Sequence, residues 1–155
     1  MIYISHDLPA DVDGQPTLDR KAGWEGLVMK ANNALPFVPA MSHCEVIQRL
    51  SDSVFDREIE FRGQRFTERI SLEEPHRVVF TRLSGPVLGT IVNAIEGPDD
   101  NPRLRFSFAL VVEGTPGGSP DETSYADGMS DDYLKAVEAT LQATHRLAAE
   151  ASRAN

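Results

Sequence analysis

Hydrophobic and polar residues alternate through the middle of the chain, in six segments that are separated by turn residues. The segments cover about 43–50, 54–62, 65–73, 77–83, 88–96 and 103–113, and Gly, Pro, Asp and Asn mark the turns. Alternation with a period of two indicates strands with one buried face. A spacing near ten residues with tight turns predicts an antiparallel meander, and a further short strand is expected over 2–6.

Hydrophobic residues recur with the period of a helix before and after these strands. The first helix is expected over 17–32, with Thr17 as its N-cap. The second follows positions 119–122, which fit a capping box with proline at the first helical position, and it extends to about residue 151. Its apolar stripe contains Tyr125, Met129, Tyr133, Val137, Leu141 and Leu147.

Aligning the strands on their turns gathers the large apolar side chains on one face of the sheet. Five polar side chains also fall on that face, namely Gln48, Arg57, Glu68, Arg82 and Asn93. With a two-residue hairpin loop at 63–64, Arg57 lies one diagonal step from Glu68. The neighbouring hairpins place Arg82 opposite Glu68 and Gln48 opposite Arg57.

Two arginines and a glutamate on an apolar face need an explanation, because an unpaired buried charge costs several kcal/mol or is neutralised. One interpretation is a structural ion-pair network inside the sheet. The other is the polar wall of a ligand cavity. In the second case the surplus of one positive charge favours a bound carboxylate, enolate or phenolate, since arginine binds such groups through paired hydrogen bonds.

Composition excludes several classes of partner. With 155 residues, 41% of them hydrophobic, the chain is expected to form one domain over 1–155. A formal charge of −9 argues against binding to nucleic acid and to anionic membrane surfaces. One cysteine, Cys44, allows no internal disulfide, and neither a signal peptide nor a membrane span is apparent. We therefore expect a cytoplasmic protein; oligomeric state, a homodimer included, is left open.

Signatures of common catalytic sites are missing from the sequence. It contains no nucleophile elbow, phosphate loop, dinucleotide fingerprint or zinc-protease motif. The four histidines are scattered over unrelated predicted elements, so we expect no metal and no cofactor. Cys44 is interpreted as a small buried hydrophobic residue.

Short segments along most of the chain, in the order of the predicted elements, carry a resemblance to known proteins. They are 24–31 (WEGLVMKA), 37–39, 44–46, 67–70 (TERI), 77–80, 93–96 (NAIE), 104–108 (LRFSF) and 128–129. With these segments the chain resembles the START-like superfamily, which includes the birch-pollen-allergen-like proteins, lipid-transfer domains and polyketide cyclases. Within this superfamily, the chain resembles the AtaL-like branch.

The resemblance implies an α+β helix-grip fold, in which a curved antiparallel sheet of about seven strands wraps a long C-terminal helix. It also implies a hollow between sheet and helix that holds an apolar small molecule. We take the binding of such a molecule, bearing an anionic group, as the first hypothesis. The second is a cyclase or aromatase that uses Glu68 with Arg57 and Arg82. Candidate ligand-binding residues are Trp24, Gln48, Arg57, Glu68, Phe80, Arg82, Asn93, Phe106, Tyr125, Met129 and Tyr133.

Overall fold

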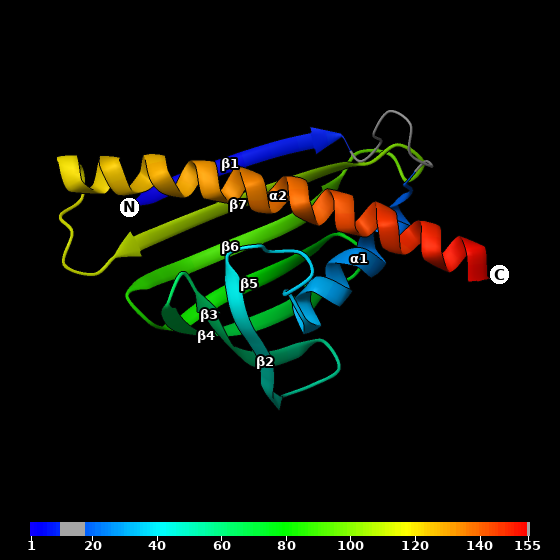
Figure 1. Cartoon of the computed structure of the whole chain (residues 1–155), viewed down its shortest axis with the longest axis horizontal. Coiled ribbons are helices and arrows are strands. Elements are labelled where there is room, and N and C mark those ends of the chain that lie inside the picture. Colours follow the sequence, from blue (N-terminus) through cyan, green and yellow to red (C-terminus); the bar gives the residue numbers. More distant parts are fainter. Residues whose placement is uncertain (10–17, 155) are drawn as a thin grey trace.

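Seven strands and two helices make up the described part of the chain (Figure 1). The computed structural model describes residues 1–9 and 18–154, except for the side chains at positions 132, 133, 136 and 151–154. The elements are β1 (Ile2–Pro9), α1 (Arg20–Asn32), β2 (Met41–Arg49), β3 (Val54–Phe61), β4 (Gln64–Glu73), β5 (Arg77–Ser84), β6 (Val87–Glu96), β7 (Arg103–Val112) and α2 (Pro120–Ala154).

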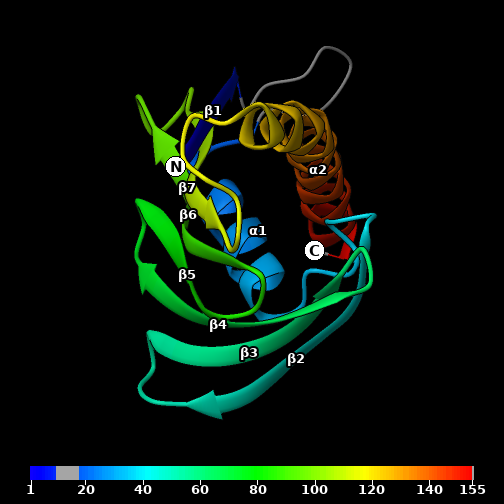
Figure 2. The ribbon, with the colours of Figure 1, turned by 90° about the vertical axis from the view of Figure 1, so that its left-hand side faces the viewer.

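All seven strands join one antiparallel sheet in the order β1-β7-β6-β5-β4-β3-β2. The sheet curves around α1, and α2 lies along its open side (Figure 2). Helix α1 packs on β5, β6 and α2, and α2 also contacts β1. This is the predicted α+β helix-grip fold. No helix in the described part of the chain has the length and apolar character needed to cross a membrane.

Local chemistry sets both helix starts. Asp19 caps α1 by accepting a 2.8 Å hydrogen bond from the Ala22 amide, whereas the predicted cap at Thr17 lies outside the described residues. At α2, Ser119 Oγ accepts from the Glu122 amide at 3.2 Å, as the capping box predicts. The Glu122 carboxylate reaches back to the Gly118 amide at 3.1 Å, and this hydrogen bond holds the pKa of Glu122 below its usual value.

The predicted register of the central strands is confirmed. Arg82 pairs with Glu68, Val78 with Asn93, and Asn93 with Phe106. Alternation decides these pairings, because a slip by one residue would turn every apolar side chain outward.

Two hairpins differ from the prediction. Arg62 and Gly63 form the two-residue turn, both with positive φ, so the turn sits one residue earlier than expected. Arg57 therefore lies directly opposite Glu68 rather than on a diagonal. Between Val46 and Gln48 the register of β2 shifts at a bulge, which pairs Val46 with Arg57. The bulge turns Gln48 to solvent, so its placement on the inner face was wrong.

The inner face of the sheet carries two apolar clusters and is crossed by a row of paired residues. One cluster surrounds Phe80 and Phe106 beneath α1, and the other surrounds Ile59 and Phe108 near the start of α2. Following the pairing from edge to edge, the row consists of Ile2, Leu110, Gly89, Arg82, Glu68, Arg57 and Val46.

The two helices cross very closely at Gly26. A Cβ atom added there would stand 2.5 Å from Thr144 Cγ2 and 2.7 Å from its Oγ1. Thr144 is buried, and its hydroxyl donates to the carbonyl oxygen of Thr140 at 2.8 Å. Glycine is thus required by space at this crossing.

Candidate functional site

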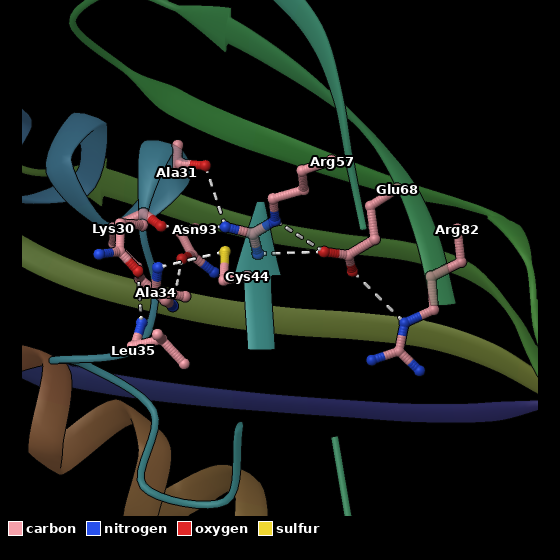
Figure 3. A network of polar contacts seen from close by, with 10 residues as sticks. Lys30, Ala31, Ala34, Leu35, Cys44, Arg57, Glu68, Arg82 and Asn93 are labelled. Carbon is pink, nitrogen blue, oxygen red and sulfur yellow. Dashed lines mark hydrogen bonds and ion pairs between the residues drawn. The ribbon is translucent and has the colours of Figure 1, made fainter. Parts of the chain in front are cut away.

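Glu68 lies at the centre of a buried ionic row on β3, β4 and β5 (Figure 3). It is only 1% exposed, and the pairing of the strands places Arg57 on one side and Arg82 on the other. Arg57 Nε and Nη2 both lie 3.0 Å from Glu68 Oε1, and Arg82 Nε lies 3.5 Å from Oε2. Each carboxylate oxygen therefore has an arginine partner.

Arg57 has its hydrogen-bonding capacity used within the protein. Besides the contacts to Glu68, its Nη1 donates to the carbonyl oxygens of Lys30 and Ala31, each at 3.0 Å. These carbonyls belong to the last turn of α1, where backbone acceptors lack helical partners. The guanidinium group also lies 5.0 Å from the Phe80 ring centroid. Arg57 is therefore an anchor between the sheet and the C-terminal end of α1.

Arg82 is engaged on one side only. Its guanidinium carbon lies 4.1 Å from the centre of the Phe66 ring, and its Nε makes the long contact to Glu68. No hydrogen bond links Nη1 or Nη2 to another described residue, and Figure 3 shows both atoms pointing away from Glu68. The next position in the row, Gly89, adds no side chain beside them. Arg82 thus has two donor groups available for a ligand.

Lys30 joins this site from α1, and its role there was not predicted. Its Nζ donates to Asn93 Oδ1 at 2.7 Å and lies 4.7 Å from the Phe106 ring centroid and 5.7 Å from that of Phe80. The buried residues of α1 include Gly23, Gly26, Leu27, Lys30 and Ala31. That spacing is the inner stripe of a helix, so periodicity in the sequence held the signal.

The surroundings of Lys30 disfavour its charge. Burial, followed by repulsion from Arg57, lowers the pKa of Lys30 from 10.5 to about 7, against a smaller opposing effect of Glu68. No carboxylate in the described part of the chain forms an ion pair with it. At neutral pH a substantial fraction of this side chain is a free amine.

Asn93 is the neutral partner of Lys30 and is fully buried. Its Oδ1 accepts from Lys30, but its Nδ2 has no hydrogen-bond partner among the described residues. A buried amide donor without a partner is costly, about 1–3 kcal/mol. An oxygen atom that reached this group would remove the cost, and it would lie next to the lysine amine.

Lys30 and the ionic row border a cavity of about 100 Å³ between the sheet and α2. The wall is mainly apolar and comes from β2 to β7, with Met129 contributed by α2 and Lys30 by α1. Arg57, Glu68 and Arg82 form its polar side. With Lys30 neutral the four ionisable groups carry a formal charge of +1, and with Lys30 protonated they carry +2. The site is thus suited to an apolar molecule with an anionic or polarised oxygen.

The predicted site residues separate into three groups. Arg57, Glu68, Phe80, Arg82 and Met129 line the cavity, as expected from the inner face. Asn93 and Phe106 lie behind this wall, where they hold the Lys30 amine. The remaining four are placed elsewhere or lie outside the description: Trp24, Gln48, Tyr125 and Tyr133.

Trp24, Gln48 and Tyr125 were predicted to bind the ligand, and the structure places all three away from the cavity. Trp24 packs in the cluster beneath α1 and borders a separate surface hollow of about 630 Å³, which carries no buried ionic group. Gln48 is exposed because of the bulge in β2. Tyr125 is 36% exposed, because the inner stripe of α2 passes through Ala126 and Met129 instead. The side chain of Tyr133 lies outside the described residues.

Comparison with known families agrees with this fold and this order of segments. A family model described as acetylaranotin biosynthesis cluster protein L, AtaL, matches residues 4–151. The chain belongs to the AtaL family. The resemblance found from the sequence is thereby confirmed. No curated protein matches this AtaL-family chain.

Solved structures with the same fold are distant in sequence from this AtaL-family protein. The Zhui aromatase/cyclase from Streptomyces sp. R1128 superposes with a TM-score of 0.74 at 13% identity, covering 93% of each chain. A START superfamily protein from Mycobacterium smegmatis gives 0.65 at 15% identity, covering 92% of this chain and 98% of its own. Ara h 8.0201 gives 0.62 at 12% identity, with 92% and 97% covered. At these identities the likeness establishes the fold.

Proposed function

We propose that this AtaL-family protein binds a hydrophobic small molecule that carries an anionic or enolisable oxygen, in the cavity between the sheet and α2. The observation that carries the proposal is the half-engaged Arg82, whose Nη1 and Nη2 have no partner among the described residues although its side chain is only 9% exposed. A buried guanidinium with unused donors favours a carboxylate, enolate or phenolate as its missing partner.

The size of the cavity limits the ligand. A cavity of about 150 Å³ is known to hold benzene, whereas pockets for drug-sized ligands are about 300–1,000 Å³. At about 100 Å³ the cavity is smaller than either, so it suits a short acyl group as it stands and a small aromatic ring after a slight shift of its wall. Met41 and Met129 border it, and their flexible unbranched side chains are the ones that can repack around something larger.

A second candidate function is a cyclase or aromatase that acts on a polyketide-type substrate. It is favoured by the likeness in fold to an aromatase/cyclase and by the positive charge around the cavity, which would stabilise an enolate. In the cyclase hypothesis drawn from the sequence, Glu68 is the residue that transfers the proton. Both oxygens of that carboxylate contact arginines, which favours a structural role for Glu68. Formation of a cyclised product from a poly-β-ketone analogue would distinguish this candidate from simple binding.

The test compares an anionic ligand with a neutral one of the same shape, benzoate with benzamide, by isothermal titration calorimetry. In Arg82→Met we expect benzoate affinity to fall by about tenfold or more, since a hydrogen bond to a charged group contributes about 1.5–3 kcal/mol. Benzamide affinity should change much less. Arg77→Met is the matched control, because Arg77 lies on the same strand but faces solvent.

Equal losses for the two ligands in Arg82→Met, with circular dichroism unchanged, would refute the anion site. Native mass spectrometry of freshly purified protein gives an independent measurement. A retained small molecule that is lost in Arg82→Met would support the proposal directly.

A further inference from the structure

We propose that Lys30 is a nucleophile that captures aldehydes or ketones entering the cavity, as an imine on its Nζ. This inference rests on the proposed function in one respect, since the carbonyl compound must enter the same cavity. It adds a covalent step and a substrate class, carbonyl compounds, that reversible binding at Arg82 does not require.

The first argument is the position of the amine. Lysines on helices usually extend along apolar surface until the charged end reaches water. Lys30 instead turns inward, is 7% exposed, and lines the cavity with Asn93 and the Phe106 ring as its nearest partners. A lysine with a merely structural role would be expected beside a carboxylate. Here no carboxylate of the described residues forms an ion pair with Lys30, and the repulsion from Arg57 exceeds the attraction of Glu68.

The second argument is the chemical state that this position imposes. Nucleophilic lysines are activated by removal from water in an apolar pocket, or by a neighbouring cation, and Lys30 has both. The hydrogen bond to Asn93 Oδ1 uses one N–H and fixes the direction of Nζ. The nitrogen lone pair then remains available for an electrophile in the cavity.

The reaction needs no co-reactant. The Nζ lone pair forms a bond to the carbonyl carbon, and the C–O π electrons move to oxygen, which takes one proton from nitrogen to give a carbinolamine. Loss of water then breaks the C–O bond, and the second nitrogen proton leaves with the oxygen. The products are one neutral imine and one water molecule, so atoms and charge balance. The step is reversible by hydrolysis.

The test traps the imine. Protein is incubated with butanone, which is small enough for the cavity, and sodium cyanoborohydride at pH 7, and labelling of each lysine is followed by peptide mass spectrometry. Lys21 and Lys135 are exposed and serve as internal references. We expect Lys30 to be labelled at least about tenfold faster, because an amine with the ordinary lysine pKa of 10.5 is almost wholly protonated at this pH.

Two further measurements separate the outcomes. The labelling rate of Lys30 should rise with a midpoint near pH 7, while that of Lys21 keeps rising to about pH 10. Benzoate should slow labelling of Lys30 and leave Lys21 unchanged. Labelling of Lys30 no faster than Lys21, in protein that still binds benzoate, would overturn the nucleophile but not the proposed function. Rapid labelling without any benzoate binding would overturn the anion site and keep the nucleophile.

Discussion

A lysine that ends between an amide and two aromatic rings lowers the stability of the folded state whenever it carries a charge. Lys30 has a pKa of about 7 in the folded protein, against 10.5 as its ordinary value. Between these two values the unfolded chain binds one more proton than the folded one. Stability therefore rises with pH across this window, is highest above it, and is lost as pH falls toward 7.

Lys30→Met should reveal this dependence. The free energy of unfolding of the variant, minus that of the natural protein, should be largest near pH 6. We expect the difference to change by up to about 1.4 kcal/mol for each pH unit above 7, because one proton is linked to folding. Urea unfolding at half-unit steps from pH 6 to 9 measures the slope, with Lys21→Met as the exposed control. A difference that does not vary with pH would contradict the buried amine.

At the scale of single residues, the sequence predicted the pairing of Glu68 with Arg82 but not the place of Lys30 in the site. Glu68 and Arg82 were found because each sits in a strand whose alternation fixes the face of every residue. Lys30 was missed because a lysine on a helix is ordinarily solvated, and only its place among Gly23, Gly26 and Leu27 indicates an inward direction. Asn93 was correctly predicted on the inner face, but its hydrogen bond with Lys30 of α1 was not predicted.

The elements are joined by contacts of two different kinds. Helix α1 is anchored to the sheet through Arg57, whose Nη1 binds the carbonyls of Lys30 and Ala31. Against α2 it is held by close packing, at the point where Gly26 meets Thr144. The polar anchor fixes the end of α1, and the glycine fixes how near the two helices approach.

Gly26→Ala tests the second contact. The added methyl group overlaps Thr144, and such overpacking costs about 1–3 kcal/mol, which exceeds the gain of up to about 1 kcal/mol in helix propensity. In a Thr144→Ala background the same change should become neutral or stabilising, because the clashing atoms are gone. Urea unfolding of the four proteins gives the coupling energy. Additive effects would show that the two residues do not meet.

The elements themselves were predicted to within a few residues, while two of the hairpin registers were not. Arg62 takes a positive φ that is uncommon for a residue other than glycine, so a loop starting at Gly63 was the natural expectation. The bulge after Val46 leaves no mark in the pattern of residues, because Ile47 and Gln48 read as ordinary alternation. One extra residue there was enough to move Gln48 from the inner face to solvent.

In the molecule as a whole, the cavity lies where the two apolar clusters meet. Phe80 belongs to one cluster, and Ile59 and Phe108 belong to the other, yet all three border the same space. Arg57, Glu68 and Arg82 line this space from the middle of the curved sheet. The sequence predicted that row and its direction, whereas cavity volume depends on packing that no local pattern encodes.

Met129→Trp tests the importance of this space. The indole should fill most of a cavity of about 100 Å³, so benzoate affinity should fall at least about tenfold and the melting temperature should stay constant or rise. Met29→Trp, on the exposed side of α1, is the control. Differential scanning fluorimetry with and without benzoate measures both quantities. Undiminished affinity in Met129→Trp would place the ligand elsewhere.

Lys30 is held at both ends, since its carbonyl accepts from Arg57 and its amine donates to Asn93. A free lysine side chain has about 2 kcal/mol of rotamer entropy to lose when it is immobilised. Here that freedom is given up when the chain folds, before any ligand arrives. The entropic cost lowers the stability of the protein and leaves affinity untouched, so an incoming molecule meets an amine already aimed at it.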